Sequence, residues 1–186
     1  MVQNALPSAD NTDGTWTDKD GGATLYTSID DPVGSADDTT TFIKATDDGS
    51  EHACIIELGN LTAPSADTAT FTYKALTEDA AGTGNPPDLK IELLENDSVL
   101  DPAVTVTDTS IATDNFTAET TSSLDVSGVS DWTDLQVRLT LIPGDGAGYG
   151  ESDLMKVTQV YLTIPDAGSS TPIAAIAMNT YRQMRG

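Results

Sequence analysis

The sequence contains few of the residues on which most catalytic and metal sites depend. Among 186 residues there is one cysteine, Cys54, and one histidine, His52. One cysteine cannot form an internal disulfide, and two sulfur or nitrogen ligands are too few for a structural zinc site. A Ser-His-Asp or Cys-His catalytic set would have to use His52, which shares one face of a predicted strand with Cys54 but has no companion motif. We therefore expect no catalytic residue, no metal ligand, no cofactor and no enzyme activity.

Basic residues are also scarce, with 8 lysines and arginines against 30 aspartates and glutamates and a net charge of −22. Such a surface repels nucleic acid phosphates and anionic membranes. No apolar run is long enough to span a bilayer. Residues 1–13 lack the basic and apolar regions of a signal peptide. We expect synthesis in the cytoplasm, with neither nucleic acid nor membrane as a partner.

The residues that are abundant favour strands and turns. The clearest strand is predicted over residues 132–142, because apolar and polar residues alternate there with a period of two. Its apolar set is Leu135, Val137, Leu139 and Leu141, and its polar set is Gln136, Arg138 and Thr140. The other predicted strands are residues 23–29, 41–45, 52–58, 69–76, 88–95, 98–100, 104–106, 116–124 and 154–164. A change of phase near residues 156–160 indicates a β-bulge. Together they predict an all-β fold, an antiparallel two-sheet β-sandwich that is jelly-roll-like and covers residues 1–165.

Three Asp-Gly loops, at residues 10–14, 18–22 and 47–49, bring carboxylates close together. None has the spacing of an EF-hand, so we expect turns, with calcium binding as the alternative. Trp16 lies in a polar loop and is the best candidate for an exposed aromatic that could stack on a sugar. Its alternative position is as a plug in the open end of the sandwich.

The C-terminal end differs in composition from the rest. Residues 166–171 are predicted to be a linker, and residues 172–186 a docking arm or short amphipathic helix. All acidic residues lie before residue 167, whereas the arm carries two arginines. The residues expected to dock on a partner are Ile173, Ile176, Tyr181, Arg182, Met184 and Arg185.

Five stretches of the sequence resemble small structural proteins of tailed bacteriophages. They are residues 15–16, 21–32, 37–43, 132–139 and 157–165. The resemblance implies a jelly-roll or β-sandwich component of the virion, such as a capsid decoration or cement protein.

From this resemblance and the composition we expect a non-enzymatic virion protein. It would be a homo-oligomer, and its C-terminal arm would anchor it to the major capsid or tail protein. Two alternatives stay open: a tail or adaptor component, and a carbohydrate-binding module or adhesin that uses loops and Trp16.

Overall fold

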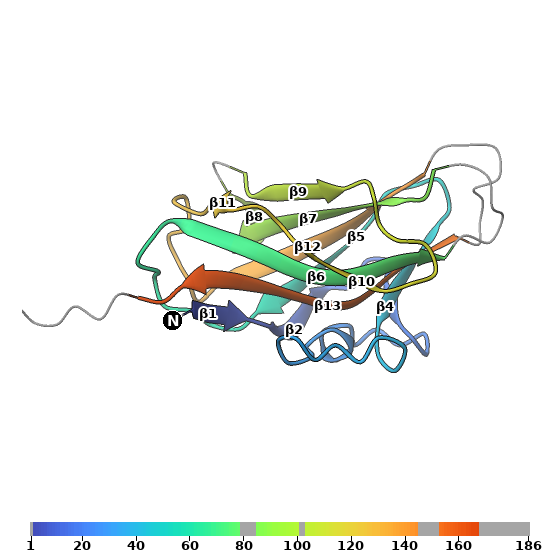
Figure 1. Ribbon diagram of the computed structural model, residues 1–186, viewed down its shortest axis with the longest axis horizontal. Coiled ribbons are helices and arrows are strands. Elements are labelled where there is room, and N and C mark those ends of the chain that lie inside the picture. Colours follow the sequence, from blue (N-terminus) through green and yellow to red (C-terminus); the bar gives the residue numbers. More distant parts are fainter. Residues whose placement is uncertain (1, 79–84, 101–102, 145–152, 168–186) are drawn as a thin grey trace, which may run out of the picture.

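The computed structural model describes residues 2–78, 85–100, 103–144 and 153–167. Strands and one short 3-10 helix make up the regular structure of these ranges (Figure 1). The elements are β1 (Val2–Ala5), β2 (Pro7–Thr12), β3 (Thr17–Asp18), η1 (Tyr26–Ser28), β4 (Ile43–Asp47), β5 (His52–Leu58), β6 (Thr68–Glu78), β7 (Asp88–Glu95), β8 (Ser98–Val99), β9 (Thr105–Asp108), β10 (Thr117–Thr120), β11 (Leu124–Asp125), β12 (Leu135–Ile142) and β13 (Asp153–Pro165).

The strands form two sheets that pack face to face. Sheet 1 has the order β10-β6-β13-β4-β3, with β1 added to β13 and β11 added to β6. Sheet 2 has the order β2-β5-β12-β7-β8, with β9 also paired to β7. The named strands of the described ranges all pair antiparallel. The predicted all-β, two-sheet antiparallel sandwich is therefore confirmed.

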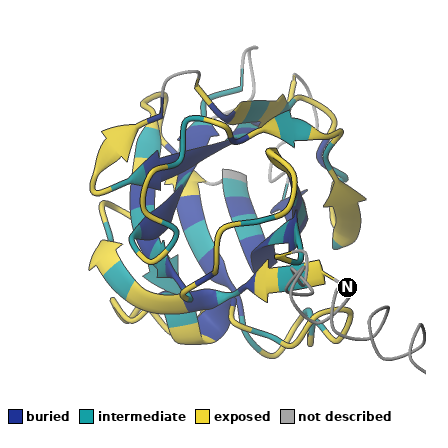
Figure 2. Ribbon diagram, turned by 90° about the vertical axis from the view of Figure 1, so that its left-hand side faces the viewer, coloured by how far each residue is buried: buried dark blue, intermediate teal, exposed yellow. Residues whose placement is uncertain are grey.

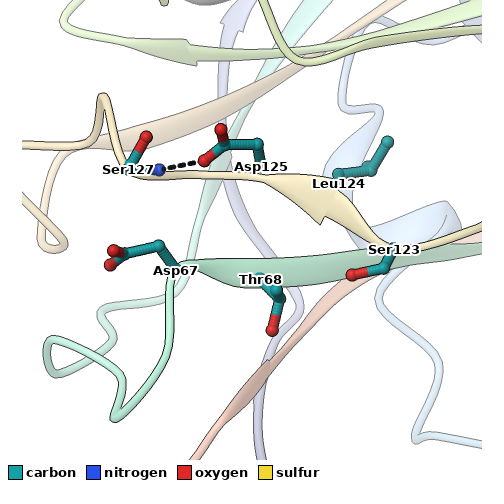
Figure 3. A pocket seen from close by; sticks show the side chains of 6 residues that line it. All are labelled: Asp67, Thr68, Ser123, Leu124, Asp125 and Ser127. Atoms are coloured by element: carbon teal, nitrogen blue, oxygen red, sulfur yellow. Dashed lines mark hydrogen bonds between the residues drawn. The ribbon is translucent and has the colours of Figure 1, made fainter.

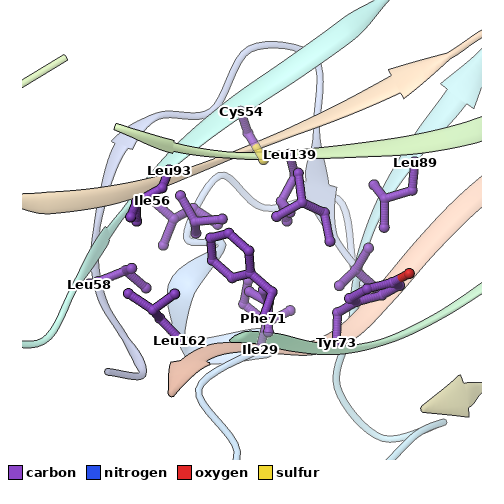
Figure 4. Close-up of a cluster of buried hydrophobic side chains, with 14 of the residues drawn as sticks. Ile29, Cys54, Ile56, Leu58, Phe71, Tyr73, Leu89, Leu93, Leu139 and Leu162 are labelled. Carbon is purple, nitrogen blue, oxygen red and sulfur yellow. The ribbon is translucent and has the colours of Figure 1, made fainter. Parts of the chain in front are cut away.

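The core lies between the two sheets and follows from the alternation of their strands. The view along the sheets shows buried residues lining the inside of both layers (Figure 2). Phe71 and Leu162 of sheet 1 belong to the same cluster as Ile56 and Leu139 of sheet 2, and all four side chains have no exposed surface (Figure 4). Burying each of these side chains stabilises the fold by about 1.5–3 kcal/mol before ordering costs.

The prediction of a strand over residues 23–29 is wrong. This segment contains η1, and the fully buried side chains of Leu25 and Ile29 flank it. The carboxylate of Asp10 accepts hydrogen bonds from the backbone N–H groups of Leu25 (2.9 Å) and Tyr26 (2.7 Å). This short run contains apolar and β-branched residues, which favour a strand. It forms a turn instead, because the carboxylate of Asp10 accepts hydrogen bonds from its backbone N–H groups.

Two further differences concern strand boundaries. The chain begins with two strands that sequence patterning does not predict: β1 belongs to sheet 1 and β2 to sheet 2, so the chain crosses between the sheets at Leu6. The predicted strand 116–124 is divided between β10 and β11, which both pair with β6.

The predicted bulge is present in β13, where the register against β6 shifts between Val157 and Gln159. Because of the extra residue, Thr158, the alternation of inward-facing and outward-facing side chains in β13 changes phase at this point. As a result two consecutive polar side chains reach a segment that we call the covering segment (residues 30–42). Gln159 Nε2 donates to the carbonyl oxygens of Asp31 and Pro32, each at 2.9 Å, and Thr158 Oγ1 donates to that of Thr41 at 2.8 Å.

Aromatic and charged contacts complete the attachment of the covering segment to sheet 1. Phe42 lies with its ring centroid 6.2 Å from that of Phe116, and Lys156 Nζ is 4.9 Å from the Phe42 centroid. An ion pair joins Lys74 of β6 to Asp38. The outer face of sheet 1 is thus partly covered by the chain itself.

Candidate functional site

The residues that the sequence predicts for partner docking lie outside the described residues. They are Ile173, Ile176, Tyr181, Arg182, Met184 and Arg185. The same holds for all of the predicted arm, residues 172–186, and for most of the predicted linker. The docking hypothesis therefore stays a prediction.

His52 and Cys54 point to the same face of β5, as predicted, but their surroundings differ. The thiol of Cys54 is completely buried, and this burial raises its pKa far above the ordinary value. His52 Nε2 lies 2.8 Å from Asp48 Oδ1, and its backbone oxygen accepts a hydrogen bond from Trp16 Nε1 at 3.0 Å. The buried thiol would be a poor nucleophile, because the thiolate form is the reactive one.

The carboxylates of the three Asp-Gly loops organise turns. Asp10 accepts from the N–H groups beside η1, Asp18 from Asp20 and Gly22, and Asp47 from Gly49 and Gly144. In the described ranges, no three His, Cys, Asp or Glu side chains gather closely enough to hold a metal ion.

Trp16 is not an exposed platform. Only 1% of its surface is accessible, and it belongs to the core cluster. Trp16 is therefore buried, as the alternative to an exposed position required, and it packs within the core cluster. The large hydrophobic side chains that are exposed among the described residues are Val2, Val33 and Val99, and none is aromatic.

The outer face of sheet 2, which we call the open face, carries a connected set of polar side chains on its central strands. The register places Gln136 of β12 between Glu57 of β5 and Leu94 of β7. Two residues further on, Arg138 lies beside Glu92 of β7. Because directly opposed residues on one face of an antiparallel pair are close, these side chains can interact.

At one end of the open face two side-chain amides bridge two carboxylates. Gln136 Nε2 donates to Glu57 Oε1 (2.9 Å) and Asp97 Oδ1 (3.1 Å), and Asn11 Nδ2 donates to the same two oxygens at 2.9 Å each. The backbone N–H of Asp97 donates to Gln136 Oε1 at 2.8 Å. Asn96 and Asp97 have φ values of 49° and 60°, which suit the tight hairpin between β7 and β8. The network therefore fixes this turn against three strands.

Next along the face is an ion-pair cluster. Arg138 Nε donates to Glu92 Oε2 at 2.7 Å, and Lys90 Nζ is 3.5 Å from the same oxygen. Burial tends to raise the pKa of Glu92, but the hydrogen bond and positive charge of Arg138, together with Lys90, outweigh it and lower the pKa. The Arg138 side chain is 28% exposed, and its hydrogen bond among the described residues is the one to Glu92. Glu92 therefore holds in place a cationic side chain that is partly accessible to solvent.

The sequence predicts the residues of this site that lie on β12, but not their partners on other strands. The alternation over residues 132–142 predicts that Gln136, Arg138 and Thr140 share an outward face. Their partners Glu57, Glu92 and Asp97 come from other strands and a turn, and strand order is not readable from the alternation.

Comparisons with known proteins give only weak likenesses. No family model and no curated protein sequence matches the chain. Among solved structures, the C-terminal CBM6 of LamC, a marine laminarinase from Zobellia galactanivorans, has a TM-score of 0.42 and 9% identity, covering 88% of this chain and 99% of that one. The xylan-binding module CBM15 has a TM-score of 0.43 and 10% identity, covering 90% and 99%. The enzymatically active domain of tailspike protein 4 of bacteriophage CBA120 has a TM-score of 0.43 and 8% identity, covering 87% and 19%.

These TM-scores do not decide between the functions that the sequence left open. The resemblance to phage structural proteins is supported only as far as the β-sandwich architecture. Within the described ranges, no helix has the length and hydrophobicity needed to cross a membrane.

Proposed function

We propose that this chain is a non-catalytic binding domain that holds a neutral glycan on the open face of sheet 2. The observation that supports the proposal is the side chain of Arg138, which Glu92 holds in place on the outer face of sheet 2 and which is partly accessible to solvent. A donor that is already oriented loses little entropy when it binds a ligand oxygen.

The neighbours of Arg138 suit a ligand with many hydroxyl groups. The partly accessible polar side chains near it are Glu57 and Lys90 on the adjacent strands, whereas Gln136 and Thr140 of β12 are buried and support the surface from below. Carboxylate and carbonyl oxygens accept from hydroxyl groups, whereas guanidinium and ammonium groups donate to them. A surface with both kinds of group can therefore bind the hydroxyl groups of a glycan.

The charge of the protein favours a neutral ligand over an acidic one. With a net charge of −22, the chain repels polyanions at long range. None of the exposed large hydrophobic side chains among the described residues is aromatic, so we expect hydrogen bonds to be the main attraction. We therefore expect weak affinity, with a Kd of about 1 mM per site.

The test is to measure binding of the full chain to a panel of neutral soluble polysaccharides by affinity electrophoresis and calorimetry. Arg138→Gln should weaken binding at least about tenfold, as expected when a charged hydrogen-bond donor is lost. The matched control is Lys74→Gln, which removes a cation from an ion pair on sheet 1. An equal loss in both variants, or no binding by the unaltered chain to any member of the panel, would contradict the proposal.

A second candidate is the virion structural protein implied by the sequence resemblance, with a capsid or tail protein as partner. The observation that favours it is the charge division of the chain, in which residues 167–186 contain two arginines and no acid. Co-purification with assembled particles, lost when residues 168–186 are deleted, would support this candidate. Particle association that survives the deletion would argue against anchoring by the arm.

A further inference from the structure

A hollow at one end of the sandwich, separate from the open face, combines negative charge with an apolar floor. Its acidic part, of about 450 Å³, is lined by Asp67, Thr68, Ser123, Leu124, Asp125 and Ser127 (Figure 3). Its apolar part, of about 180 Å³, includes Val2, Ala69 and Pro165. Thr68 and Ser123 line both parts, so the two parts adjoin. We call the whole region the end hollow.

Strand pairing explains why two carboxylates lie together there. Asp125 is opposite Thr68 in the pairing of β11 with β6, and Asp67 directly precedes Thr68. Asp125 Oδ1 accepts a hydrogen bond from the N–H of Ser127 at 2.9 Å, and this contact lowers the pKa of Asp125. Neither carboxylate has a cationic partner among the described residues. The end hollow therefore keeps its negative charge at neutral pH.

The end hollow also lies where the sandwich ends. Pro165, the last residue of β13, lines its apolar part, and the chain continues from there into residues 166–186. Residues 167–186 of that stretch contain two arginines and no acidic residue. Its apolar residues recur at the spacing of an amphipathic helix, and a helix of this length is marginal in water unless its apolar face is covered.

We propose that residues 172–186 dock on the end hollow of their own chain. Ile173 or Ile176 packs against Val2, Ala69 and Pro165, and Arg182 and Arg185 pair with Asp67 and Asp125. Attachment through a six-residue linker gives the arm an effective concentration in the millimolar range at this site, which favours the chain's own arm over that of a second copy. The inference concerns a different surface from the open face and does not depend on glycan binding.

The test uses the full chain and limited trypsin cleavage after Arg182, followed by intact mass. Because cleavage samples the undocked arm, its rate reports the undocked population. Asp67→Asn with Asp125→Asn should speed cleavage about fivefold, as expected for the loss of two exposed ion pairs. The matched control is Asp114→Asn with Glu119→Gln, two exposed carboxylates on and near β10 that change the net charge equally.

Further readouts keep the result interpretable. Unchanged melting temperatures in both double variants would show that cleavage is not following global unfolding. Hydrogen–deuterium exchange over residues 172–186 should rise in the first variant and stay constant in the control. Equal cleavage rates in all three proteins would overturn the proposal. A mass by light scattering that rises with concentration and is reduced by Asp67→Asn with Asp125→Asn would also overturn it, in favour of docking between copies.

Discussion

The outer faces of the two sheets differ in what covers them. On sheet 1 the covering segment lies over β13 and β6, and Gln159 binds its backbone carbonyl groups. On sheet 2 the equivalent residue, Gln136, binds side chains and a turn of its own layer. Both glutamines are almost completely buried, at 4% and 2% exposure. The two buried glutamines therefore have different structural roles. Gln159 attaches the covering segment to sheet 1, whereas Gln136 orders a network of polar side chains on sheet 2.

The largest expected difference between the faces is in apolar packing. Phe42→Ala removes a ring of the covering segment that packs near Phe116 and Lys156, and it should lower the free energy of unfolding by about 3 kcal/mol. Ile55→Ala is the matched change on the open face, where the side chain is only half-buried, and it should cost about 1 kcal/mol. Urea unfolding measures both. Equal costs would mean that the covering segment adds no packing to sheet 1.

A smaller effect is expected from the paired glutamines. Gln159→Leu leaves the carbonyl groups of Asp31 and Pro32 without their donor, and Gln136→Leu leaves Glu57 and Asp97 with one amide fewer. Each should cost about 2 kcal/mol, since buried polar partners lose their hydrogen bonds.

Proteolysis separates the two glutamine variants. Only Gln159→Leu should accelerate cleavage by Asp-directed proteases within residues 30–42, because only that change detaches the covering segment. The Gln136→Leu variant serves as the control for general destabilisation. If both variants are cut there at the same rate, the attachment of the covering segment does not depend on Gln159.

The smallest expected effect concerns pH, and its sign is opposite on the two faces. Burial raises the pKa of Asp31 above its ordinary value of 3.8, and the negative charges of Asp37, Asp30 and Asp38 add to this against an opposing hydrogen bond from the Asp37 N–H. The ionised group therefore costs stability at neutral pH, and this cost is relieved as the pH falls through the folded-state pKa towards 3.8. Asp31→Asn should stabilise the protein at pH 7 and have less effect near pH 4.

The pKa of Glu92 on the open face is lowered, because Arg138 and Lys90 outweigh burial. Its contribution is present above the ordinary value of 4.5 and is lost as the pH falls through the lower folded-state pKa. Glu92→Gln should therefore destabilise the protein at pH 7 and become neutral in strong acid. Urea midpoints for both variants over pH 3–7 measure this, and shifts of the same sign at pH 7 would refute the contrast.

The sequence predicts those parts of the fold in which the pattern is local. The alternation around Leu139 and the change of phase near Thr158 both correspond to observed features, a central strand and a bulge. The prediction of a strand around Leu25 is wrong, because a short apolar run has the same sequence pattern in a strand and in a buried turn. The carboxylate of Asp10 decides between them from fifteen residues away.

Only the part of the candidate site that lies on β12 can be predicted from the sequence. Arg138 was expected to face outward, but the partner that fixes it, Glu92, lies 46 residues earlier. That pairing depends on which strands become neighbours, and this is set by packing of the whole core. For the same reason the covering of sheet 1 by residues 30–42 could not be read from the strand patterns.

The pairing of β1 with β13 determines how the domain responds to tension. Val2 is opposite Pro165 and Ala5 is opposite Leu162, so both ends of the sandwich lie at the same place. A force that pulls these two ends apart acts across the β1–β13 pairing, so its hydrogen bonds would break one after another. We therefore expect β1 to detach from β13 at low force. Since the chain passes from β1 into β2 at Leu6, continued pulling would next act on the edge of sheet 2 and on the free end of β13, and would reach the central strand β12 later.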